Sequence, residues 1–119
     1  MLYSNREYSL TNKTIDAETM SLAYSFLTED EKITHTFDAD DIIALFTTKK
    51  IIFVHIAKNK FYETELLPYQ SISRHSVLGV PNANHGKLEL YLSDEIILTF
   101  YMPIYSDAVK LCRMITEQR

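Results

Sequence analysis

The stretch FTTKKIIFVHIAKNKFYETELLPYQSI, residues 46–72, decides the fold that the sequence predicts. Its apolar residues recur at a period of two, which is typical of strands, and the short polar runs TTKK and KNK interrupt them. Pro68 ends the last of these strands because proline cannot donate to a ladder. We therefore predict antiparallel strands joined by tight turns at 42–47, 50–57 and 61–67.

The same period continues on both sides of this stretch. It predicts further strands at 32–37, 72–80, 87–93 and 96–100. Helical spacing of apolar residues is found at the two ends, over 14–27 and after Pro103. The apolar stripe of the closing helix consists of Ile104, Ala108, Leu111, Cys112 and Ile115. We predict a mainly β fold with two helices, in which about seven strands form a sandwich or partly open barrel capped by the C-terminal helix.

The size and charge of the chain limit its function. A chain of 119 residues with 46% apolar residues is sufficient for one domain with a real core. The net charge of −4 argues against nucleic acid as a partner. A single cysteine and a polar start without a leader segment favour the cytoplasm. We expect one structural unit, with an N-terminal arm and helix at 1–27 and the main domain at 28–119, and the polar residues 1–13 are either a loose arm or an edge segment.

Several stretches in order resemble the bacterial pleckstrin-homology-like (PH-like) domain family. They are EKI at 31–33, Asp41-Ile42-Ile43, FTTKKIIFV at 46–54, LPYQSI at 67–72 and KLELYLS at 87–93, followed by the amphipathic helix. The sequence departs from the family pattern at Lys50, where arginine is usual, and in the KNK turn, which lacks glycine. The resemblance implies a PH-like seven-stranded sandwich and, because members form such assemblies, a ring-like homo-oligomer.

A cluster of lysines at the hairpin ends is the candidate binding site for an anionic ligand. Its members are Lys49, Lys50, Lys58 and Lys60. They would bind anionic membrane lipids or phosphorylated ligands, or they simply keep the hairpin ends soluble. The predicted first turn at 38–41 is acidic and would repel phosphate, so a membrane is the less favoured partner.

The residues that carry metal or catalytic chemistry are scattered. The four histidines, His35, His55, His75 and His85, lie on different elements without metal-ligand spacing. The carboxylates of Asp38, Asp40 and Asp41 lack the spacing of a calcium loop. Glu63 and Glu65 share a strand face, and Cys112 lies on an apolar stripe. We expect no metal, no cofactor and no enzymatic activity.

Two neighbouring strands are apolar on both faces. The residues that need cover outside the sandwich core are Ile43, Leu45, Ile52, Val54 and Ile56. The cover is either the N-terminal helix, a second copy of the chain or another protein. Tyr62, Tyr91 and Tyr101 are of a type enriched at interfaces and favour assembly. The hypothesis is a non-catalytic interaction module that self-associates and binds an unidentified protein partner.

Overall fold

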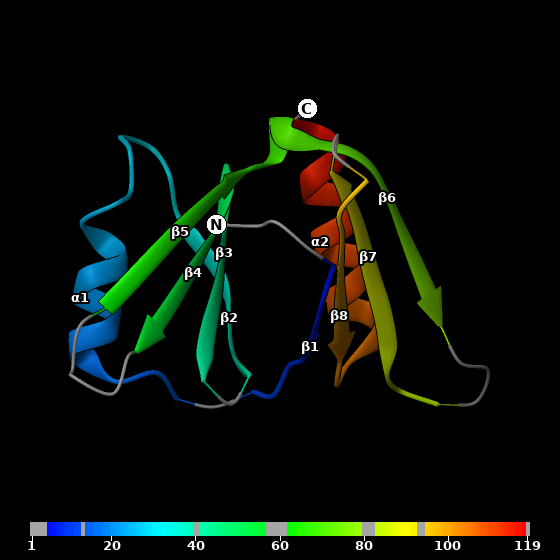
Figure 1. The fold of residues 1–119 in the computed structure, drawn as a ribbon, viewed down its shortest axis with the longest axis horizontal. Helices are drawn as coiled ribbons and strands as arrows, with labels where there is room; N and C mark the ends of the chain where they lie inside the picture. Colours follow the sequence, from blue (N-terminus) through cyan, green and yellow to red (C-terminus); the bar gives the residue numbers. More distant parts are fainter. Residues whose placement is uncertain are drawn as a thin grey trace.

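Two four-stranded sheets face each other in the computed structural model, which describes residues 5–12, 14–39, 41–56, 62–79, 83–92 and 95–118 (Figure 1). The first sheet contains β2 (Ile33–Ala39), β3 (Ile42–Thr47), β4 (Lys50–Ile56) and β5 (Tyr62–Pro68). The second contains β1 (Arg6–Ser9), β6 (Ile72–Gly79), β7 (Gly86–Leu92) and β8 (Ile97–Met102). The helices are α1 (Ala17–Tyr24) and α2 (Tyr105–Gln118), and a 3₁₀ turn, Tyr69–Ser71, joins β5 to β6. Within these described residues no helix is long and apolar enough to span a membrane.

The first sheet is an antiparallel meander in the order β2-β3-β4-β5. β3 has the predicted bounds, and β4 and β5 differ from theirs by one residue. Thr47 closes the turn between β3 and β4, because its hydroxyl oxygen accepts the backbone N–H groups of Lys49 and Lys50 at 3.0 and 2.9 Å. The polar run TTKK is therefore a turn, as predicted.

The second sheet has the order β1-β8-β7-β6 and contains a strand that the apolar pattern does not predict. β6, β7 and β8 pair antiparallel, whereas β1 lies parallel to β8 at the sheet edge. Tyr8 and Leu10 hold this N-terminal segment in place, since their side chains are buried in the core. Of the two interpretations of residues 1–13, a loose arm or an edge segment, the structure has the edge segment at Arg6–Ser9.

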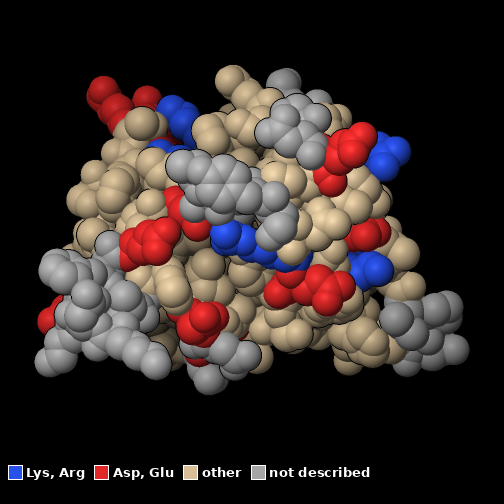
Figure 2. All heavy atoms as spheres, viewed as in Figure 1, with Lys and Arg blue, Asp and Glu red and all other residues tan. Residues whose placement is uncertain are grey.

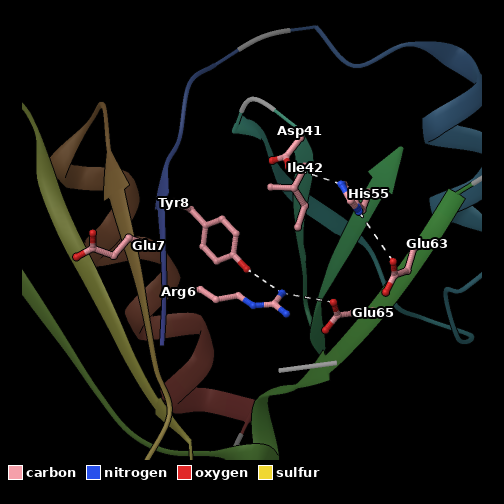
Figure 3. Close-up of a pocket in the computed structure, with 8 residues that line it drawn as sticks. All are labelled: Arg6, Glu7, Tyr8, Asp41, Ile42, His55, Glu63 and Glu65. Carbon is pink, nitrogen blue, oxygen red and sulfur yellow. Dashed lines mark hydrogen bonds and ion pairs between the residues drawn. The ribbon is translucent and has the colours of Figure 1, made fainter. Parts of the chain in front are cut away.

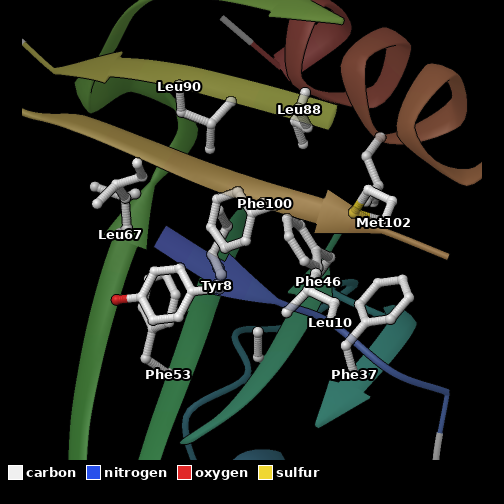
Figure 4. Packing of buried hydrophobic residues seen from close by; sticks show 14 of the residues in the cluster. Tyr8, Leu10, Phe37, Phe46, Phe53, Leu67, Leu88, Leu90, Phe100 and Met102 are labelled. Carbon is white, nitrogen blue, oxygen red and sulfur yellow. The ribbon is translucent and has the colours of Figure 1, made fainter. Parts of the chain in front are cut away.

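The core lies between the two sheets and is closed by α2 (Figure 4). Tyr8 stacks on Phe53 and Phe100, with ring centroids 5.6 and 5.2 Å apart, and Phe46 meets Phe100 edge to face at 5.6 Å. The predicted stripe of the closing helix is confirmed from Ala108 to Ile115, whereas Ile104 precedes α2 and is 42% exposed. The fully buried residues of that stripe are Ala108, Leu111 and Ile115.

A second, smaller apolar cluster lies on the opposite side of the first sheet, where α1 packs (Figure 1). Leu45, Ile52 and Val54 are fully buried there, together with Ala23 of α1. Of the possible covers for the two-sided apolar strands, the structure uses the N-terminal helix. Ile43 is partly buried in the same cluster, and the side chain of Ile56 lies outside the described residues.

Candidate functional site

A charged cleft of about 510 Å³ opens where β1 faces the ends of β3, β4 and β5 (Figure 3). Its lining residues are Arg6, Glu7, Tyr8, Asp41, Ile42, His55, Glu63 and Glu65. Figure 2 shows acidic side chains around the middle of this face, with a short strip of basic side chains between them. The cleft is thus mainly acidic.

Arg6 is held across the cleft between the two sheets. Its Nη1 atom lies 3.4 Å from Glu65 Oε1 on β5 and 3.5 Å from the hydroxyl oxygen of Tyr8. Burial raises the pKa of Tyr8, and the neighbouring guanidinium offsets part of that rise. The position of Arg6 follows from the alternation of β1, because Arg6 and Tyr8 point toward the first sheet whereas Glu7 between them points the other way (Figure 3).

His55 lies between two carboxylates at the rim. Its Nε2 atom is 3.6 Å from Asp41 Oδ2, and its Nδ1 atom is 3.9 Å from Glu63 Oε2. Glu63 and Glu65 share a strand face as expected, but Glu65 faces the Arg6 guanidinium and Glu63 faces the His55 imidazole. Among the described lining residues there is no serine, threonine or cysteine that could serve as a hydroxyl or thiol nucleophile.

Lys50 points into the protein rather than toward solvent. Its Nζ atom lies 2.8 Å from Glu31 Oε1 and donates to the carbonyl oxygen of Phe26 at 2.8 Å. The Glu31 side chain is 0% exposed and that of Lys50 is 11% exposed. The charge of Lys50 is therefore already neutralised within the chain.

The other candidate lysines are not brought together with Lys50. The exposed Lys49 contacts the Thr28 hydroxyl at 3.3 Å and the Glu29 carbonyl at 3.5 Å. Lys58 and Lys60 lie outside the described residues. An anionic-ligand site made by all four lysines remains a prediction.

The remaining candidate residues are spread over the fold. His35 lies 3.8 Å from Asp107, and burial lowers the pKa of its imidazole. His75 pairs with the Thr116 hydroxyl at 2.8 Å, and burial raises the pKa of the Cys112 thiol. In the part of the chain that the structure describes, no three His, Cys, Asp or Glu side chains form a metal-binding group.

The β6 edge is the second candidate surface. β6 is the last strand of the second sheet and, among the described strands, pairs with β7 alone (Figure 1). Leu78 on β6 is 44% exposed and lies opposite Lys87, which lies opposite the 40% exposed Tyr101. Leu78, Lys87 and Tyr101 therefore form a row across β6, β7 and β8, with an exposed leucine at one end and an exposed tyrosine at the other.

The residues of the charged cleft that sequence reasoning missed are on β1. Arg6 and Tyr8 belong to a polar arm in which only Tyr8 and Leu10 hint at a period of two. Two apolar residues are too few to identify a strand, and the partner strand is about ninety residues away. The one signal for Arg6 and Tyr8 is therefore this short alternation near the end of the chain.

Comparisons with known proteins identify the fold. No known protein family and no curated protein matches the sequence. A DUF1696 family protein with a pleckstrin-homology domain from Shewanella loihica PV-4 is similar in structure, with a TM-score of 0.64 and 17% identity over 96% of this chain and 97% of that one. A pleckstrin homology domain from Shewanella amazonensis SB2B has a TM-score of 0.56 and 18% identity, over 90% of each chain.

The fold expected from the sequence resemblance is thereby confirmed. The chain has a PH-like fold with two sheets, a C-terminal helix that closes the core and an N-terminal helix outside the first sheet. A PH-like fold hosts many unrelated tasks, so activity has to be argued from the surfaces described above.

Proposed function

We propose that this chain is a non-catalytic interaction module that self-associates and binds a protein partner. The observation that carries self-association is the β6 edge with its exposed Leu78. A strand at a sheet edge offers a row of N–H and C=O groups that another strand can pair with. β6 is eight residues long and contains neither proline nor lysine, and the guanidinium of its Arg74 lies over the Tyr91 ring at 4.2 Å rather than along the edge.

The pairing partner of β6 determines the shape of the assembly. If β6 pairs with β6 of a second copy, the interface is two-fold and the product is a dimer. If β6 pairs with a different edge of the next copy, the assembly is a ring when the rotation between copies closes and an open filament when it does not. The mass in solution distinguishes these two geometries, and either one uses the same edge.

Replacing Leu78 with glutamate is expected to dissociate the assembly. The new carboxylate puts a charge on the edge strand, and it lies opposite Lys87, so the fold itself gains a cross-strand ion pair. Light scattering at tens of micromolar should give a defined oligomer for the natural chain. For Leu78→Glu it should give the monomer mass, or an assembly that needs about tenfold more protein.

Leu66 provides a matched control. It is also 44% exposed, and it lies on β5, one of the two edge strands of the first sheet. Leu66→Glu should leave the oligomer mass unchanged if β6 is the edge in use. A monomeric natural chain at these concentrations would contradict self-association, and dissociation by Leu66→Glu alone would assign the contact to β5.

A further inference from the structure

The apolar outer face of the first sheet is a surface built to hold a helix. Leu45 on β3 and Ile52 and Val54 on β4 are 0% exposed because α1 lies over them. Partly buried residues of the segment around α1 complete the cluster. They are Met20, Leu22, Phe26 and Leu27. The chain thus demonstrates in itself which kind of element fits this face.

The resident helix is a poor occupant of that face. α1 has eight residues, which is too short for a helix to be stable without tertiary packing. The two α1 positions that are fully buried carry small side chains, Thr19 and Ala23, and one of these is polar. A helix with larger apolar side chains at these positions would bury more apolar surface.

The buried hydroxyl of Thr19 is expected to weaken the packing of α1 on the sheet. Its backbone N–H donates to Asp16 Oδ1 at 2.8 Å, but its buried hydroxyl oxygen has no hydrogen-bond partner within the described residues. The backbone N–H of Thr19 and, to a smaller extent, its side chain lower the pKa of Asp16, the residue that caps α1. A buried hydroxyl without a partner weakens the packing that contains it.

The chain is fixed to the first sheet on both sides of α1. Before it, the backbone N–H of Thr11 donates to the carbonyl of Asp38 at 2.8 Å. After it, Lys50 donates to the carbonyl of Phe26 at 2.8 Å. Neither contact involves a residue of α1, so both would remain in place if α1 left the sheet.

We propose that the face formed by Leu45, Ile52 and Val54 binds an amphipathic helix of a protein partner, which displaces α1. The partner carries an apolar residue where α1 has Thr19. A second copy of this chain is a weaker competitor, because its α1 has the same threonine and the resident helix has the advantage of its tether. The protein partner of the proposed function would thus be an α-helix with one apolar face. The surface that binds it is separate from the β6 edge, so helix binding and self-association can fail independently.

The first test follows the opening of α1 in the full chain by hydrogen exchange. Thr19→Val removes the buried hydroxyl at nearly constant volume and should slow exchange of the α1 amides about tenfold. Ala23→Asp places a charge against the sheet and should speed exchange of α1 while β3 and β4 stay protected. Unchanged or faster exchange in Thr19→Val would show that the hydroxyl does not weaken α1 and would overturn the proposal.

The second test measures whether a helix in trans takes the vacated face. The probe is a fluorescein-labelled peptide of residues 14–27 that carries Thr19→Val, and the readout is fluorescence anisotropy with each full chain. The peptide should bind the Ala23→Asp chain at least about tenfold more tightly than the natural chain, and the Thr19→Val chain most weakly. The matched control is the same peptide with Ala23→Asp, which should not bind.

Two results would overturn helix binding. One is equal peptide affinity for the natural chain and the Thr19→Val chain, a comparison that holds even if Ala23→Asp fails to fold. The other is no peptide binding to a folded Ala23→Asp chain whose α1 exchanges freely. Either outcome leaves the light-scattering result on Leu78→Glu unaffected.

Discussion

Replacing Lys50 with methionine is expected to lower the free energy of unfolding by about 3–5 kcal/mol, because the Glu31 carboxylate then stays buried without its positive partner. Glu31 is fully buried, and its Oε1 atom lies 2.8 Å from Lys50 Nζ. Breaking a buried ion pair costs far more than the pair itself contributes. The lysine that looked like a ligand-binding candidate is thus expected to be a structural residue.

The carboxylate of Glu31 also holds the local backbone together. It accepts the Thr28 backbone N–H at 2.9 Å and the Thr28 hydroxyl at 3.1 Å, and the Thr47 hydroxyl donates to its second oxygen. Tyr69 donates to the Thr47 carbonyl at 2.7 Å. Because the ion pair lies at the centre of this network, its loss should loosen the β3–β4 turn and the segment before β2.

The pH dependence of stability provides an independent check. Burial raises the pKa of Glu31, but the hydrogen bonds from Lys50, Thr28 and Thr47 outweigh burial and hold the pKa at about 2, below the usual 4.5. A lowered pKa in the folded state means a contribution that is present above pH 4.5 and is lost as the pH falls through about 2. This shift corresponds to about 3 kcal/mol of stability at neutral pH.

Urea unfolding at pH 7 and at pH 3 measures both effects. Without Lys50, burial raises the pKa of Glu31, so acid should protonate it and narrow the difference in stability between the variant and the natural chain. Lys49→Met is the matched control, since its side chain is exposed, and it should change stability by less than about 0.5 kcal/mol. A loss of under about 1 kcal/mol in Lys50→Met would contradict the buried ion pair.

The sequence predicts the first sheet well because each of its strands carries its own evidence. The alternation of residues 42–47 and the turn formers around it are local signals, and β3 has the predicted bounds. The closing helix is predicted for the same reason, since a stripe at 3.6-residue spacing requires no knowledge of what it packs on.

The candidate sites are less predictable because they depend on contacts between distant residues. Lys49 and Lys50 are neighbours in the sequence, and nothing local says that Lys50 turns inward to Glu31, nineteen residues earlier. Likewise, the apolar outer face of β3 and β4 can be read from the pattern, but its cover cannot. Several covers satisfy the same pattern, and only the three-dimensional structure identifies α1 among them.

Replacing Tyr8 with alanine is expected to destabilise the chain by about 3–5 kcal/mol, the usual cost of removing a large buried aromatic side chain. Tyr8 is 8% exposed and stacks between Phe53 of the first sheet and Phe100 of the second. Its loss removes contacts to both sheets and releases β1, which also carries Arg6 into the charged cleft. Equilibrium unfolding in urea gives the size of the effect.

Two matched variants separate packing from other causes. Tyr8→Phe keeps the ring and loses only a hydroxyl whose contact with Arg6 is long, at 3.5 Å, so it should cost under about 1 kcal/mol. Tyr24→Ala removes a tyrosine that is 57% exposed and should change stability by less than about 0.5 kcal/mol.

If Tyr8→Ala is equally mild, residues 5–11 are a detachable arm, and the cleft they border forms only when that arm is docked. A large loss places the N-terminal strand inside the cooperative core, so removing residues 1–27 would unfold the protein rather than merely uncover a surface.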